Sequence, residues 1–133
     1  MIKSIVFTLT LLSISPLVIQ AQSNDLYIVF NEASWCKYCK ANGERIHQLV
    51  DEYALKNNVL VISNDVTNEE TKKNAVPQLT ELGLYDFMQF RKEAAIVFVF
   101  DASSNSLLDK FSIKLDNEKI LTILNQSLAK VSQ

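Results

Sequence analysis

The chain has 133 residues, of which 48% are hydrophobic, so it is long and apolar enough for one domain with an ordinary core. Its formal net charge of -2 gives no electrostatic basis for binding nucleic acid. With only two glycines and two prolines, it cannot assemble a glycine-rich phosphate loop.

The first twenty or so residues differ in character from the rest. Lys3 supplies a short positive start, residues 5–14 are apolar, and Ala21 has the small side chain that precedes many cleavage sites. This pattern predicts a signal peptide over residues 1–21 and a mature domain over residues 22–133. We therefore expect a secreted or periplasmic bacterial protein.

An uncleaved membrane anchor is the alternative interpretation of the same segment. Residues 5–19 contain Pro16 and fall short of the roughly 20 apolar residues that span a bilayer. We therefore favour cleavage, with no membrane span in the mature protein.

The only two cysteines follow a predicted strand. The apolar run at residues 26–31 is typical of a buried strand, and residues 36–55 have the apolar spacing of a helix. Cys36 and Cys39 would then lie in the first turn of that helix, where its N-terminal partial charge and Lys37 stabilise a thiolate. Cys36 is therefore the candidate nucleophile for disulfide exchange, and Cys39 would resolve the mixed disulfide.

Two other interpretations of the cysteine pair are weaker. A structural disulfide across so short a loop contributes about 2 kcal/mol, against about 3 kcal/mol for a fifteen-residue loop. A zinc site needs two further ligands, and the chain has a single histidine, His47. His47 follows Cys36 by roughly 16 Å of helix, so we predict a surface or partly packed histidine and no metal site within one chain.

The next segment predicts a strand followed by broken helix. Residues 59–65 form a second apolar strand with a polar end. Thr67 and Glu70 have the spacing of a capping box, so a helix is expected to begin at Thr67. Proline restarts it, and we expect a short helical piece over residues 77–82 that ends at Gly83.

The last third of the chain completes the sheet. The aromatic-rich residues 84–91 are interpreted as core packing, with a partner-binding surface as the alternative. Strands are predicted at residues 96–100 and 107–113, and Asp116 or Asn117 can cap a final amphipathic helix. The predicted fold class is α/β, a mixed central sheet of about four strands with helices on both faces.

This order of elements and two local motifs resemble the thioredoxin-like superfamily. The motifs are Trp-Cys-x-x-Cys-Lys, which ends at Lys40, and Asp65-Val66-Thr67 at a strand end. The chain is most similar to the secreted thioredoxin-like domain at the C-terminal end of bacterial thiol:disulfide interchange reductases. The resemblance covers about residues 26–131 and implies a thioredoxin-like fold.

The resemblance also implies roles for residues of the cysteine motif. Trp35 would shield the site, Cys36 would be the exposed nucleophile, and Cys39 would be the buried resolving thiol. Lys37 and Tyr38, between the cysteines, would help to activate or shield them.

Two positions depart from the family pattern. The family places a buried acid near Phe30, where this chain has none, and Glu32 is the candidate substitute. The family's cis-proline would fall at Ala94 and Ala95, which are therefore candidates for the substrate groove.

The predicted function is an exported thiol-disulfide oxidoreductase that exchanges disulfides with protein substrates through its Cys-x-x-Cys dithiol. It would need no cofactor, and its partners would be protein dithiols or disulfides and a redox partner protein. The alternative is a redox-inactive binding module with a static bridge between Cys36 and Cys39. Metal binding by the two cysteines together with a second chain is a minor third option.

Overall fold

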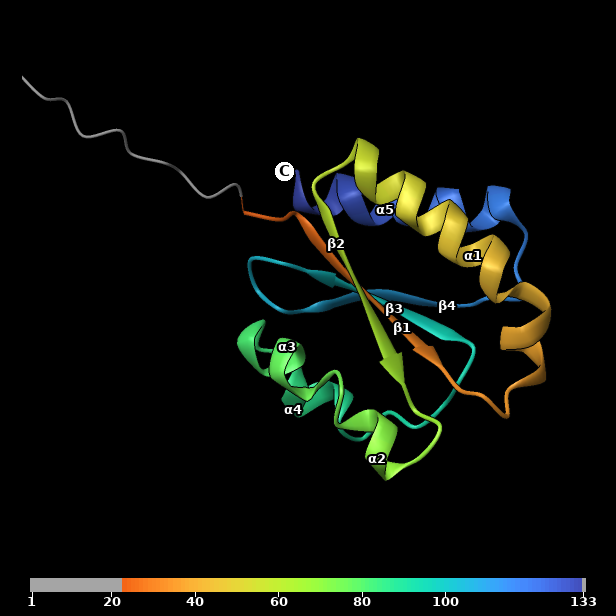
Figure 1. The fold of residues 1–133 in the computed structure, drawn as a ribbon. Coiled ribbons are helices and arrows are strands. Elements are labelled where there is room, and N and C mark those ends of the chain that lie inside the picture. The colour runs from red at the N-terminus through yellow and green to blue at the C-terminus, as the bar shows by residue number, and fades with distance from the viewer. Residues whose placement is uncertain (1–22, 133) are drawn as a thin grey trace, which may run out of the picture.

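The computed structural model describes residues 23–132, so the predicted signal peptide at residues 1–21 lies outside the described part. The described residues form four strands and five helices (Figure 1). In chain order these are β1 (Leu26–Glu32), α1 (Lys37–Lys56), β2 (Val59–Asp65), α2 (Glu69–Lys72), α3 (Val76–Glu81), α4 (Tyr85–Met88), β3 (Ile96–Asp101), β4 (Leu107–Ser112) and α5 (Asn117–Val131).

The strands form one mixed sheet in the order β2-β1-β3-β4. Strand β1 is parallel to β2 and antiparallel to β3, and β4 pairs antiparallel with β3. The central strand β1 pairs Ile28 with Val61 on one side and with Val99 on the other. The predicted mixed sheet of four strands is thereby confirmed.

Helices cover both faces of the sheet, as the sequence predicts. Figure 1 shows α1 and α5 over one face and α2, α3 and α4 over the other. Because side chains alternate along a strand, β1 sends Ile28 to the α1 and α5 face and Val29 to the opposite face. Each face therefore has its own buried apolar cluster, and the sheet lies between the two.

The expected helix start at Thr67 is wrong by one residue. Asn68 caps α2. Its side chain accepts a hydrogen bond from the Thr71 N–H, and the Asn68 N–H donates to the Thr71 side chain. The Thr67 hydroxyl instead bonds to Asp65 at 2.5 Å, which removes it from the helix end. Gly83, the expected stop after α3, does adopt a positive φ of 75°.

The aromatic-rich segment mainly fills the core. Met88 is buried, and the Phe87 ring packs edge-on against Phe98 and Phe100. Phe90 differs from them, because 76% of its surface is exposed. Within residues 23–132, no helix combines the length and apolar character needed to cross a bilayer.

Candidate active site

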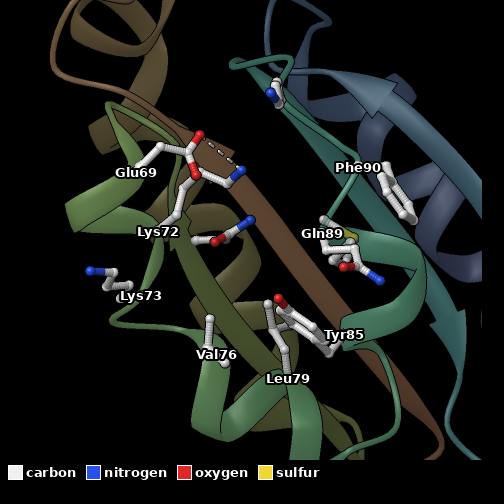
Figure 2. A pocket seen from close by; sticks show the side chains of 11 residues that line it. Glu69, Lys72, Lys73, Val76, Leu79, Tyr85, Gln89 and Phe90 are labelled. Carbon is white, nitrogen blue, oxygen red and sulfur yellow. Dashed lines mark ion pairs between the residues drawn. The ribbon is translucent and has the colours of Figure 1, made fainter.

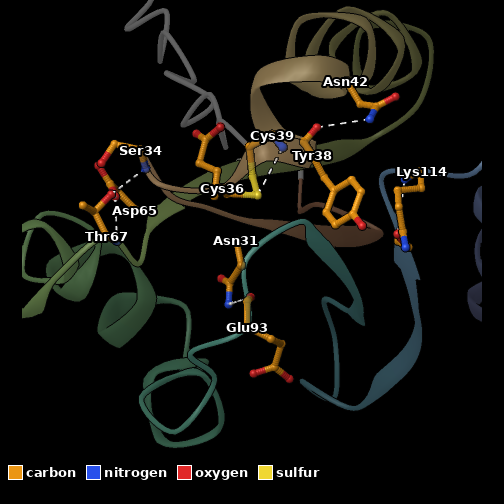
Figure 3. Close-up of a disulfide and its surroundings, with 12 residues drawn as sticks. Asn31, Ser34, Cys36, Tyr38, Cys39, Asn42, Asp65, Thr67, Glu93 and Lys114 are labelled. Atoms are coloured by element: carbon orange, nitrogen blue, oxygen red, sulfur yellow. Dashed lines mark hydrogen bonds between the residues drawn. A yellow bond between two sulfur atoms is a disulfide. The ribbon is translucent and has the colours of Figure 1, made fainter.

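Cys36 and Cys39 form a disulfide at the N-terminus of α1 (Figure 3). Their Cα atoms are 5.3 Å apart, within the usual range for a disulfide. Cys36 is the N-cap of the helix, and its Sγ accepts a hydrogen bond from the Cys39 backbone N–H at 3.1 Å. The Cys36 sulfur thus lies where the helix presents its partial positive charge.

The exposure of the two cysteines is the reverse of what the family resemblance implies. Only 6% of Cys36 is exposed, whereas Cys39 is partly buried. Cys36 belongs to the same buried apolar cluster as Ala33 and Ala95. The Cys39 side borders a shallow pocket.

Trp35 is hydrogen-bonded to the loop after β2. Its ring is 60% exposed, and its Nε1 donates to the Thr67 carbonyl at 3.0 Å. The Ser34 N–H donates to the Thr67 hydroxyl oxygen at 2.9 Å, and that hydroxyl donates to Asp65. Thr67, whose role the sequence did not reveal, therefore connects the cysteine loop to the end of β2.

Asp65 remains a carboxylate in this arrangement. Hydrogen bonds from the Thr67 hydroxyl and then from the Thr67 N–H lower the pKa of Asp65 below its ordinary value. Negative charge is therefore fixed at the end of β2, beside the cysteine loop.

Glu32, the candidate substitute for the family's acid, does share a pocket with Cys39. The pocket is also lined by Lys40 and Asp65. Glu32 accepts a bond from the Ser63 hydroxyl, and its Oε2 lies 2.9 Å from His47 Nε2.

His47 is partly packed, as predicted, and its contact with Glu32 is the feature that sequence reasoning missed. Its ring stacks on Phe30 with the centroids 4.4 Å apart. Phe30 is buried, and the carboxylates that line the pocket with Cys39 are those of Glu32 and Asp65.

Lys37 and Tyr38 lie on the outer surface of the first turn of α1. Tyr38 is 40% exposed, and Lys37 Nζ lies 5.0 Å from its ring centroid. Lys114, from the turn after β4, places its Nζ 4.5 Å from the same centroid. No sequence signal links Lys114 to the cysteine motif, because the contact depends on the tertiary fold.

Ala95 belongs to the buried cluster that contains Cys36, and Ala94 packs against that cluster; their role as groove candidates stays a prediction. Ala95 has a φ of 65°, and its N–H donates to the Asn31 carbonyl at 2.9 Å. Its carbonyl accepts from the Ile113 N–H at 3.1 Å. Every peptide bond in residues 23–132 is trans.

A buried amide pair fixes the loop that carries these alanines. Asn31 is fully buried, and its Oδ1 accepts from Asn64 Nδ2 at 2.8 Å. Its own Nδ2 lies 3.3 Å from both the Arg91 and the Glu93 carbonyl oxygens. In the sequence, the one signal for this role of Asn31 was its polar side chain at the end of the apolar run at residues 26–31.

Comparison with known proteins bears on the fold. No model of a known protein family matches the chain, and no curated protein matches it. Solved structures do: thioredoxin from Malassezia sympodialis is 17% identical, with a TM-score of 0.52, and the match covers 80% of each chain. Trxlp from Edwardsiella tarda is 15% identical, with a TM-score of 0.51, over 77% of this chain and 84% of that one. The chain has a thioredoxin-like fold.

A further thioredoxin-like neighbour is MTB DsbF in its mixed oxidized and reduced forms. It is 9% identical, with a TM-score of 0.52, and the match covers 79% of this chain and 82% of that one. The predicted fold is therefore confirmed for the described residues.

This thioredoxin-like domain has a second cavity, of about 460 Å³, that shares no lining residue with the disulfide pocket. Lys72, which pairs with Glu69 at 3.6 Å, lies on its rim, and Met88 and Leu79 line its apolar part (Figure 2). No cysteine or histidine lines the cavity. Residues 23–132 also contain no cluster of three or more metal-ligating side chains.

Proposed function

We propose that the protein is a thiol-disulfide oxidoreductase that acts on protein substrates through Cys36 and Cys39. The observation that carries the proposal is the position of the pair: Cys36 caps a 20-residue helix and accepts the Cys39 N–H. In the reduced protein the same N–H and the helix N-terminus would stabilise a Cys36 thiolate, the reactive species in exchange.

The exchange has two steps. The Cys36 thiolate attacks one sulfur of a substrate disulfide, a Cys36–substrate disulfide forms, and the other substrate sulfur leaves as a thiolate. The Cys39 thiolate then attacks Cys36 Sγ, which forms the Cys36–Cys39 disulfide and releases the second substrate thiolate. Two electrons pass to the substrate, and a dithiol partner protein restores the reduced pair. The same steps in reverse oxidise a substrate dithiol.

Glu32 is the proposed proton acceptor for Cys39, because its carboxylate lines the pocket that Cys39 borders. Cys39 must lose a proton before the second step. Replacing Glu32 with Gln should therefore slow resolution and let the mixed disulfide accumulate, while the first attack keeps its rate. Stopped-flow measurement of both steps checks this assignment.

A second candidate function is a binding module with a static bridge. The burial of Cys36 within the apolar cluster favours it, because covered sulfurs exchange slowly. The reduction potential separates the two functions: a structural bridge lies below about -300 mV, and a working pair lies above it.

Equilibration in glutathione buffers, followed by thiol trapping and Trp35 fluorescence, tests the proposal. The oxidoreductase proposal expects a midpoint among known dithiol exchangers, with Cys36→Ser as the control that cannot close a bridge. A pair that stays oxidised at the reducing extreme would support the static module.

We also propose export to a bacterial periplasm or beyond the cell, on the basis of the predicted signal peptide at residues 1–21. N-terminal sequencing of the protein isolated from a periplasmic fraction should begin at Gln22. Retention of Met1 in a membrane fraction would contradict cleavage.

A further inference from the structure

The surface beside the disulfide carries two lysines on one aromatic ring. We define the basic-aromatic patch as Lys37, Tyr38 and Lys114. Lys37 Nζ and Lys114 Nζ lie 5.0 and 4.5 Å from the Tyr38 ring centroid. Tyr38 is 40% exposed, so the patch is open to a partner.

The positive charge of the patch is not neutralised within the domain. Among the ion pairs of residues 23–132, none involves Lys37 or Lys114. The chain as a whole has a formal net charge of -2, so the patch is a local exception to the protein's acidic balance. Two unneutralised cations held together attract an anionic group.

The fold holds Lys114 in place. Arg45 of α1 donates from Nη2 to the Ile113 carbonyl at 2.9 Å and to the Leu115 carbonyl at 3.1 Å. The carbonyls on both sides of Lys114 are therefore tied to the helix that carries the cysteines. Tyr38 belongs to that helix, and its own carbonyl accepts from Asn42 at 3.1 Å.

The two sides of the disulfide differ in charge. Figure 3 shows Tyr38 and Lys114 on one side of Cys36 and Cys39, and Asp65 with Thr67 on the other. Glu32 and Asp65 line the pocket next to Cys39 together with Lys40. A bound polypeptide would therefore meet two lysines on the Tyr38 side, and two carboxylates with one lysine on the Asp65 side.

We propose that the basic-aromatic patch selects protein substrates whose exchanging cysteine is flanked by acidic residues. This inference rests on the proposed function and names its substrate class. An Asp or Glu of the substrate pairs with Lys114 and Lys37, and its neighbouring cysteine reaches Cys36. Lys114 acts on substrate selection and leaves the chemistry of the two exchange steps unchanged.

Matched peptides test the proposal. Each peptide carries one cysteine, joined by a disulfide to a neutral reporter thiol, and differs only in having two Glu, two Gln or two Lys on each side. The reduced protein, expressed from its full-length sequence, is mixed with each peptide, and the second-order rate constant of exchange is measured at two salt concentrations. We expect the Glu peptide to react about five-fold faster than the Gln peptide, the size that two exposed ion pairs supply.

Variants assign the preference to the patch. Lys114→Gln should reduce the Glu-over-Gln preference to about two-fold, and added salt should weaken it. Lys130→Gln makes the same charge change on an exposed position of α5 and should leave the preference unchanged. A Glu-to-Gln rate ratio near one in the unmodified protein would overturn the proposal. A Glu-to-Gln rate ratio that Lys114→Gln leaves unchanged would also overturn it. Equal slowing of all three peptides by Lys114→Gln would also overturn it, because the lysine would then act on the thiolate.

A binding measurement separates this inference from the proposed function. The same peptides with Ser in place of Cys cannot exchange, and their binding to the oxidised protein is followed by Trp35 fluorescence. Tighter binding of the Glu peptide, lost in Lys114→Gln, supports the patch even if no peptide exchanges. Absence of exchange from all three cysteine peptides would contradict only the oxidoreductase function, and equal binding of all three serine peptides would contradict the patch.

Discussion

Two connections between strands that follow each other in the chain are built in different ways. Strands β1 and β2 are joined through α1, a single helix of 20 residues, whereas β2 and β3 are joined through three helices of four, six and four residues. The long helix is held by a regular apolar stripe that includes Ile46 and Val50. The second connection buries Leu79 and Met88 and is also held by individual polar bonds, such as those from Asn31 to the Arg91 and Glu93 carbonyl oxygens.

We assign the reactivity of the cysteines to the first connection and the recognition of substrates to the second. The long helix supplies the dipole and the N-cap geometry at Cys36, which need a rigid element. The second connection ends at Ala94 and Ala95, which pack with the buried cluster that contains Cys36. Changes to its polar bonds should therefore alter the backbone at residues 91–95 while α1 stays intact.

The largest expected effect comes from Ala95→Pro. Proline fixes φ near -65°, but Ala95 has a φ of 65°, and its N–H is needed by the Asn31 carbonyl. We expect a loss of more than about 3 kcal/mol in unfolding free energy, measured by urea denaturation. Ala95→Gly, the control, should stay within about 1 kcal/mol because glycine accepts a positive φ. Equal stability of the proline variant would show that the left-handed backbone is not required.

Asn31→Leu should come next, at about 3 kcal/mol, because it leaves Asn64 Nδ2 and two loop carbonyls without their partner. Hydrogen exchange should speed up in residues 91–95 while α1 stays protected. Gln126→Leu, an exposed amide on α5, should change stability by less than about 0.5 kcal/mol.

The double variant Asn31→Leu with Asn64→Leu sharpens this result. It should lose less than the sum of the two single losses, because it removes both members of the buried pair. If the double variant lost as much unfolding free energy as the two single variants together, the result would contradict the direct Asn31–Asn64 bond.

Thr67→Val should cost about 1 to 2 kcal/mol at pH 7, since the variant loses the hydroxyl bonds to Ser34 and Asp65. Because the folded pKa of Asp65 is lowered, its carboxylate stabilises the protein above the unfolded pKa, and that contribution is lost as the pH falls through the folded pKa. The difference in unfolding free energy between the two proteins should therefore shrink as the pH falls from 7 through the folded pKa of Asp65.

A matched change elsewhere provides the control for the acid dependence. The Ser103 hydroxyl lowers the pKa of Asp101, which lies at the end of the sheet opposite the disulfide. Ser103→Ala should change the acid dependence of stability but leave the disulfide-exchange rate unaltered. A gap between wild type and Thr67→Val that stays constant with pH would contradict the assigned role of Asp65.

The smallest effect is a gain. Gly43 lies within α1, and an added Cβ would meet no atom within 4 Å. Gly43→Ala should therefore stabilise the protein by about 1 kcal/mol and raise the Tm. Gly83→Ala should do the opposite, because its φ is 75° and the new Cβ would lie 2.5 Å from Asn105 Nδ2. Destabilisation by Gly43→Ala would show that α1 is not the simple regular helix described.

The regular elements could be predicted because they repeat a local pattern. The apolar runs and the helical stripe placed all four strands and both long helices to within a few residues. The start of α2 could not be predicted in the same way, since Thr67 and Asn68 are both capping residues. The choice between them depends on Asp65, because the Thr67 hydroxyl donates its hydrogen bond to the Asp65 carboxylate instead of capping the helix.

The candidate site could be predicted only as far as the cysteine motif. Asn31 and Asn64 meet because the parallel strands pair them directly, a register that neither segment reveals by itself. Lys114 reaches Tyr38 through a turn that Arg45 fixes from another element. Cys36 and Ala95 likewise share a buried cluster only in the folded chain, and no local pattern indicates the positive φ of Ala95.

The most direct test of the account is mixed-disulfide trapping with Cys39→Ser and Cys36→Ser. Each reduced variant is offered a protein disulfide, and the covalent complex is resolved by non-reducing electrophoresis and mass spectrometry. We expect Cys39→Ser to form a stable complex through Cys36, and Cys36→Ser to form little. A complex formed mainly through Cys39, the less buried residue, or by neither variant, would contradict the assignment of Cys36 as the nucleophile.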